Sequence, residues 1–165
     1  MYATFRVINY YDEKRYNDLK NNGLETIGKV SPRIGRVQVH YMIDKVTLSN
    51  FSNSPFSGIG EGEFFFMKVD KKDYKNIFVE FHKPVIPKKD LIYFRFTNIF
   101  SFDNDLLTNN DVVFKYYVEN ILYKRFQKLP KKKQLNPSLF NSNEVIYDVR
   151  NPQIAYLKSF VYFVD

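Results

Sequence analysis

Hydrophobic and polar residues alternate with a period of two along most of the chain, which is typical of strands with one buried face. The alternation predicts strands over residues 3–10, 36–48, 63–69, 76–83, 91–100, 144–149 and 153–164. It shifts phase near Asp44 and Lys45, which indicates a bulge or a bend. Several of the connections are short, and short connections favour antiparallel neighbours.

Two segments follow a helical pattern instead. Residues 12–21 begin at a candidate N-cap, Asp12, and end just before Gly23. Residues 111–128 place apolar side chains on one broad stripe. The sequence therefore predicts an α+β fold in a single domain, 1–165. We expect a curved, mostly antiparallel sheet of about 6–7 strands, with the long helix packed on one face.

The period of two also divides each strand into a core face and a second, mixed face. The core face is predicted to carry Val37, Val39, Tyr41, Ile43, Phe65, Met67, Val69, Ile77, Val79, Phe81, Ile92, Phe94, Phe96, Ala155, Leu157, Val161 and Phe163. All seven prolines fall between the predicted elements, where a missing N–H group costs least.

The mixed face interleaves aromatic rings with cations. The chain has 17 Phe, 13 Tyr and 25 Lys and Arg against 18 Asp and Glu, so its net charge is +7. A gene rich in A and T raises Phe, Tyr and Lys together, so the position of these residues carries the argument. Bases stack on rings and phosphates bind cations, which predicts a non-catalytic protein that binds single-stranded DNA or RNA. The predicted binding residues on the strands are Phe64, Phe66, Lys68, Tyr93, Arg95, Tyr156, Lys158 and Tyr162.

A basic segment extends this prediction. Lys124 and Arg125 lie near the end of the predicted long helix, and Lys131, Lys132 and Lys133 follow in a loop predicted over 129–143. Such a loop is suited to binding phosphates, and its affinity would fall steeply with salt. Cations also favour a helix C-terminus because they offset its dipole, which is the simpler explanation for Lys124 and Arg125.

Two other functions stay open. Another layer of the fold, a homodimer or a protein partner could cover the apolar residues of the mixed face. If a protein partner covers them, the chain would be a small phage or mobile-element protein that binds an acidic surface and inhibits a host protein, such as a defence nuclease complex. The second alternative is a metal-independent ribonuclease that uses His40 and His82 as base and acid. The hydroxyl residues expected two positions after each histidine are replaced by Met42 and Pro84.

Several chemistries are excluded or lack a signature. The chain has no Cys, which excludes disulfides and thiolate metal sites. The acidic residues match no metal-binding motif, and the glycine-rich residues 58–62 lack the Lys of a phosphate loop. We therefore predict no metal and no cofactor. The chain shows neither a signal peptide nor an apolar run long enough to cross a membrane, which predicts a cytoplasmic protein, in the host cell if viral.

Overall fold

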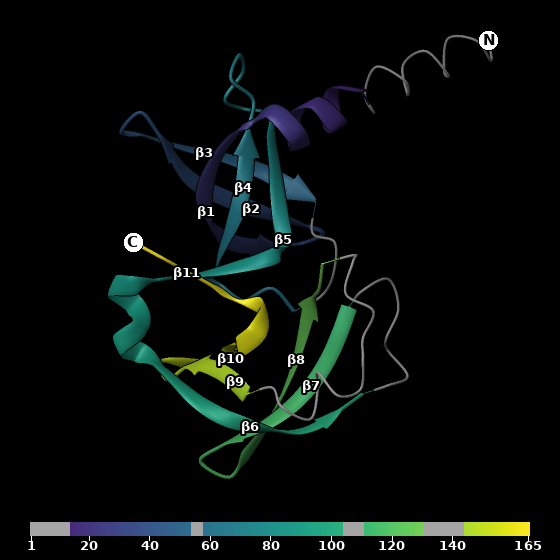
Figure 1. Ribbon diagram of the computed structural model, residues 1–165, viewed down its shortest axis with the longest axis vertical. Coiled ribbons are helices and arrows are strands. Elements are labelled where there is room, and N and C mark those ends of the chain that lie inside the picture. The colour runs from purple at the N-terminus through teal and green to yellow at the C-terminus, as the bar shows by residue number, and fades with distance from the viewer. Residues whose placement is uncertain (1–13, 54–57, 104–110, 131–143) are drawn as a thin grey trace, which may run out of the picture.

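The structure is a computed structural model that describes residues 14–53, 58–103, 111–130 and 144–165. These residues form two curved β-sheets, and Figure 1 shows one above the other with the C-terminal strand between them. Residues 14–22 are helical, close to the short helix predicted over 12–21. The described part of the chain contains no long helix packed on a sheet, so the predicted α+β class is wrong.

The first sheet has six strands in the order β11-β5-β4-β1-β2-β3. They are β1 (Leu24–Arg33), β2 (Arg36–Ile43), β3 (Val46–Asn53), β4 (Phe64–Val69), β5 (Ile77–Pro87) and β11 (Tyr162–Val164). Hairpins join β1, β2 and β3, and β4 returns to pair with β1, which makes a Greek key. β5 pairs with β4 and approaches β3, so that these five strands curl into a partly open barrel.

The second sheet has five antiparallel strands in the order β10-β9-β6-β7-β8. They are β6 (Phe94–Phe102), β7 (Asp111–Val118), β8 (Ile121–Lys128), β9 (Glu144–Asp148) and β10 (Asn151–Leu157). The 3-10 helix η1 (Lys88–Tyr93) precedes β6, and η3 (Lys158–Phe160) follows β10. A side-chain amide links the end of β10 and η3 to β8: Gln127 accepts from the Leu157 N–H at 2.8 Å and donates to the Phe160 carbonyl at 3.3 Å.

Residues 111–128 form the β7–β8 hairpin in place of the predicted long helix. The pairing runs from Asp111 opposite Lys128 to Val118 opposite Ile121. The turn residues Glu119 and Asn120 have φ of 50° and 66°, which is the left-handed pair that suits the twist of a hairpin. The start of β7 is buried on both faces, and a strand of this kind has no period-two signal to distinguish it from a helix.

Other boundaries differ from the prediction as well. The predicted strand 36–48 is the β2–β3 hairpin, with Asp44 and Lys45 at φ of 49° and 68° in its turn. β1 was not predicted, and the loop predicted over 50–62 begins inside β3. The first residues of the predicted strand 91–100 belong to the 3-10 helix η1, and the 3-10 helix η3 interrupts the predicted strand 153–164. The predicted strand 3–10 and most of the predicted loop 129–143 lie outside the described residues.

Four prolines lie inside strands, which contradicts their predicted place between elements. They are Pro32, Pro84, Pro87 and Pro152. Pro84 ends a bulge in β5, and Pro152 lies where the β9–β10 register shifts. Both sites tolerate a residue without an N–H group, because the ladder of hydrogen bonds is already interrupted there.

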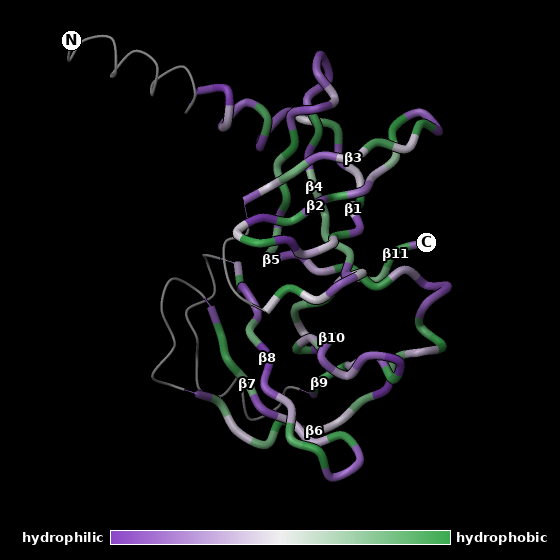
Figure 2. Tube along the Cα trace, turned by 180° about the vertical axis from the view of Figure 1, so that it is seen from behind, coloured by the Kyte–Doolittle hydropathy of each residue, from purple (hydrophilic) through white to green (hydrophobic). Residues whose placement is uncertain are grey.

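The face assignment holds where the alternation is regular. In Figure 2 hydrophobic and hydrophilic residues alternate along the strands of both sheets. Val37, Val39, Phe65 and Met67 are buried, as predicted. The prediction is wrong for three other core positions, Ile92, Phe96 and Phe163, whose side chains are 66%, 53% and 45% exposed.

A buried polar network joins the two sheets. The Arg125 guanidinium of β8 donates to both carboxylate oxygens of Glu63, at 2.7 and 2.6 Å, and to the carbonyls of Ala155 and Gly58. The Tyr156 hydroxyl donates to the same carboxylate at 2.9 Å. Burial by itself lowers the pKa of Arg125, but the Glu63 carboxylate outweighs it and the net pKa is raised. Burial and the Glu63 charge raise the pKa of Tyr156 well above its usual value.

Within the described residues no helix is long and apolar enough to span a membrane.

Candidate functional site

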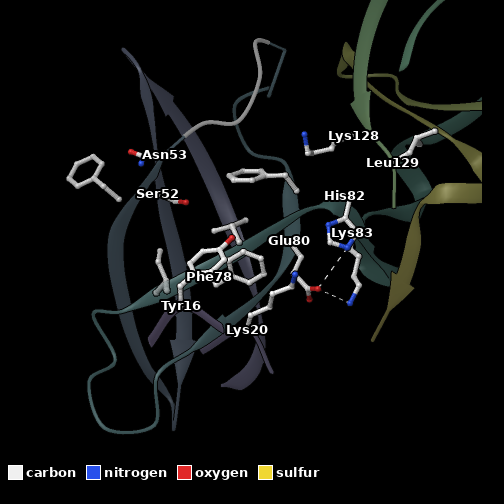
Figure 3. A pocket seen from close by; sticks show the side chains of 14 residues that line it. Tyr16, Lys20, Ser52, Asn53, Phe78, Glu80, His82, Lys83, Lys128 and Leu129 are labelled. Atoms are coloured by element: carbon white, nitrogen blue, oxygen red, sulfur yellow. Dashed lines mark ion pairs between the residues drawn. The ribbon is translucent and has the colours of Figure 1, made fainter. Parts of the chain in front are cut away.

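A cleft of about 960 Å³ lies along the opening between β3 and β5. Residues 51–53 of β3 and 77–83 of β5 form its walls, and Tyr16 and Lys20 of the helical residues 14–22 cover one side. Lys128 and Leu129 at the end of β8 close the side toward the second sheet. Figure 3 shows these side chains around the cleft. The site is therefore assembled from four segments that are distant in the sequence.

A wide bulge in β5 provides the central residues of the cleft. Met67 pairs with Val79 and Phe65 with Pro84, so residues 80–83 all lie opposite the single residue Phe66. A bulge breaks the alternation of a strand and turns side chains in new directions. It exposes part of His82 and Lys83 to the cleft while Glu80 stays 7% exposed.

Glu80, His82 and Lys83 form a charged group in this bulge. The Lys83 ammonium lies 2.9 Å from Glu80 Oε1, and His82 Nε2 lies 3.9 Å from the same oxygen. The second oxygen, Glu80 Oε2, is buried and has no hydrogen-bond partner among the described residues. Burial lowers the pKa of His82 because it disfavours the imidazolium, although the Glu80 charge acts in the opposite direction. His82 is therefore mainly neutral at pH 7.

Cations outnumber carboxylates on the walls of the cleft. Lys20, Lys83 and Lys128 line it together with a single carboxylate, that of Glu80. Lys128 also lies 3.2 Å from Asp111, and no ion pair joins Lys20 to a carboxylate in the described part of the chain. The walls of the cleft are therefore electropositive and suited to an anion.

Aromatic rings line the same cleft. Tyr16 and Phe78 pack edge to face with ring centroids 5.1 Å apart, and the Lys20 ammonium lies 5.9 Å from the Phe78 ring. Phe51 is 44% exposed, and the Arg36 guanidinium stacks on its ring at 3.9 Å. A base can stack on such a ring, and the cation beside the ring can then bind the neighbouring phosphate.

Four of the predicted binding residues come together on the outer surface of the first sheet. Phe64, Phe66 and Lys68 alternate along β4, and the Tyr162 ring packs edge to face on Phe66 at 5.5 Å. The Lys83 ammonium lies 6.0 Å from the Phe66 ring, which connects this surface to the cleft. Lys68 is less available, because it forms an ion pair with Glu25 at 2.8 Å.

Three predicted residues lie near the start of the second sheet and after its last strand, away from the cleft. The Arg150 guanidinium covers the Tyr93 ring at 3.8 Å. Arg95 donates to the carbonyls of Ile92 and Phe94, and Lys158 forms an ion pair with Glu144 at 2.6 Å. None of the three lines the cleft.

Tyr156 and Arg125, which are also predicted to bind nucleic acid, are both buried, at 2% and 4% exposure. Their polar groups bind Glu63 and leave no face for a base or a phosphate. Lys124 is exposed but lies on a strand instead of a helix end, and it pairs with Asp103 at 3.0 Å. Lys131, Lys132 and Lys133 lie outside the described residues.

The two histidines are not brought together. His40 lies in β2 opposite Lys29 and Ser49, whereas His82 lies in the β5 bulge, and β4 and β1 separate the two strands in the sheet. No contact joins the imidazoles in the described part of the chain, so the geometry gives the two-histidine ribonuclease no support. No group of side chains suited to a metal ion occurs among the described residues.

Sequence reasoning missed Lys20, Phe51, Lys83 and Lys128 as members of one site. Each comes from a different segment or from the bulge, and the alternation within a single strand cannot show that they converge. Phe78 carried a usable signal, since the period of two places it on the mixed face with Lys68, its partner across β4 and β5.

Comparison of the chain with protein-family models, curated proteins and solved structures finds no match. The function therefore has to be argued from the geometry of the cleft.

Proposed function

We propose that this protein binds single-stranded nucleic acid in the cleft between β3 and β5. The observation that carries the proposal is the convergence of three lysines, Lys20, Lys83 and Lys128, with the rings of Phe51 and Phe78 on one cleft. Lysines meet the phosphates and rings stack on the bases, which is the general way in which proteins bind single strands. The proposed function is binding alone, without a chemical step.

The shape of the first sheet supports the proposal. Partly open five-stranded Greek-key barrels bind oligonucleotides on the surface of their second and third strands and on neighbouring loops. Here β3 supplies Phe51, and its neighbour β2 supplies the Arg36 that stacks on this ring. This support comes from the topology of the sheet, and the residues of the cleft have to specify the ligand.

Part of the sequence-based site belongs to the proposed interface. Phe66 and Tyr162 adjoin the cleft through Lys83, so they can stack a further base. The proposed compartment is the cytoplasm, in the host cell if the protein is viral, because a chain without Cys suits a reducing environment.

The direct test is fluorescence anisotropy with a labelled oligothymidine over a range of salt concentrations. Each phosphate contact contributes about 0.7 to the slope of log affinity against log salt. We expect the double variant Lys20→Ala, Lys128→Ala to bind more weakly and to lower the slope by about 1.4. The matched control is Lys88→Ala, Lys89→Ala, which removes the same charge from residues that do not line the cleft.

The rings are tested separately. Phe51→Ala is expected to weaken binding by about 1–3 kcal/mol, because one stacked base is lost. Ile92→Ala removes an exposed apolar side chain that does not line the cleft and should leave the affinity unchanged. Equal affinity and equal salt slope in the wild type, the lysine double variant and Phe51→Ala would reject the proposal.

A further inference from the structure

One face of β8 leads from the cleft along the edge of the second sheet, beside the buried Val113 of β7. Lys128, Phe126 and Lys124 alternate along the strand and so share this face, and Lys128 lines the cleft. The Lys124 ammonium lies 5.5 Å from the Phe126 ring. The aromatic and basic character of the cleft therefore does not stop at its edge.

Two lysines lie directly opposite each other on this face. Lys115 of β7 pairs with Lys124 of β8 across the hairpin. Like charges at directly opposed positions destabilise a sheet, and an anion between them removes this repulsion. Lys124 has Asp103 at 3.0 Å, but no carboxylate pairs with Lys115 in the described part of the chain.

Two exposed aromatic rings lie next to this pair of lysines. Tyr117 lies two residues beyond Lys115 on β7, and its ring packs edge to face on Phe100 of β6 at 5.0 Å. Tyr117 is 42% exposed and Phe100 is 60% exposed. Leu122 lies opposite Tyr117 and ends the row on β8.

We propose that the bound strand leaves the cleft at Lys128 and runs along β8 to the ring pair Phe100–Tyr117. This inference rests on the proposed function and extends it. A phosphate would lie between Lys115 and Lys124, and a base would stack on the ring pair. From Lys128 to Leu122 the path measures roughly 20 Å, at about 3.4 Å per residue. The ligand is therefore a single strand longer than the cleft itself can hold.

The two carboxylates beside the path are compatible with this assignment. Asp103 pairs with Lys124, and Asp111 pairs with Lys128 at 3.2 Å. Partly exposed ion pairs of this kind contribute little, so a phosphate can replace either carboxylate as the partner of the lysine. The central position of two lysines also favours nucleic acid over a protein partner, because the cores of protein interfaces are depleted in lysine.

The test compares a short and a long oligothymidine, of about 6 and about 18 nucleotides, which span the site sizes of small barrels. We expect the wild type to bind the long strand more tightly. The variant Phe100→Ala, Tyr117→Ala should lower the affinity for the long strand by about tenfold or more and leave the short strand unaffected. Lys115→Ala should lower the salt slope by about 0.7 for the long strand alone.

The controls separate the two proposals. Ile92→Ala removes an exposed apolar side chain elsewhere and should change neither affinity. If the short strand binds but the long strand gains nothing, or the ring variant leaves the long strand unchanged, the path along β8 is rejected and the cleft remains. If neither strand binds the wild type, the proposed function itself fails.

Discussion

The buried ion pair between Glu63 and Arg125 allows a sharp prediction about stability. Glu63→Gln keeps the shape of the side chain but removes its charge, which leaves the buried Arg125 guanidinium without a counter-charge. Removing one partner of a buried pair typically destabilises a protein by about 3–5 kcal/mol. This is a large share of a total stability of about 5–15 kcal/mol.

A surface pair in the same protein provides the matched control. Lys158 and Glu144 are 2.6 Å apart, the same distance as Arg125 and Glu63, but their side chains are 49% and 46% exposed instead of 5% and 0%. Glu144→Gln therefore makes the same chemical change in a solvated pair, whose loss costs about 0–1 kcal/mol. The difference between the two variants isolates the effect of burial.

The assay is equilibrium urea unfolding at pH 7, followed by circular dichroism. With a slope of about 2 kcal/mol per molar urea, the midpoint of Glu63→Gln should fall by roughly 1.5–2.5 M. The double variant Glu63→Met, Arg125→Met should lose less stability than the sum of its single variants, because it leaves no unpaired charge. If Glu63→Gln unfolds at the same midpoint as Glu144→Gln, the argument from burial is refuted.

Three further predictions concern pH and the hairpin turn. Burial raises the pKa of Tyr41, Tyr116 and Tyr156 above that of a tyrosine in the unfolded chain. Below about pH 10 the phenols are protonated in both states, and their contribution to stability is complete. The free energy of unfolding should then fall as the pH rises further, as thermal melts at pH 9–11.5 would show. The pKa of His82 is lowered, so stability should decrease as the pH drops below about 6.5, and an NMR titration should place its midpoint below that value. Glu119→Gly should raise the free energy of unfolding by up to about 1 kcal/mol, because φ at this position is 50°; a lower melting temperature would contradict this.

The part of the fold that could be predicted is the part set by local alternation. Val39 and Met67 lie in regular strands with one buried face, and the period of two places both correctly in the core. The same reasoning failed for residues 111–128, because Val112 and Val113 are both buried and the alternation disappears. The decisive signal there is the turn at Glu119 and Asn120, and neither residue is the glycine that marks such turns most clearly.

The candidate site was harder to predict than the fold, for two physical reasons. The first is the bulge at residues 80–83, which changes the direction of side chains without changing the composition of the strand. The second is burial by a distant partner. The sequence around Arg125 predicts a cation on the surface. Its burial depends on the counter-charge of Glu63, which lies 62 positions away in the sequence. Such pairings are invisible to any argument based on neighbouring residues.

The Glu63–Arg125–Tyr156 network also has a consequence for the order in which the protein is made. A ribosome adds about 5–20 residues per second, so Glu63 emerges about 3–12 s before Arg125, which follows 62 residues later. Tyr156 comes later still, and β11, which pairs with the edge of β5, follows Tyr156. The strands β1 to β5 are therefore all synthesised before Glu63 can pair with Arg125 and before β11 can cover the edge of β5. The first sheet is therefore complete only after β11 has been synthesised, because β11 pairs with the edge of β5.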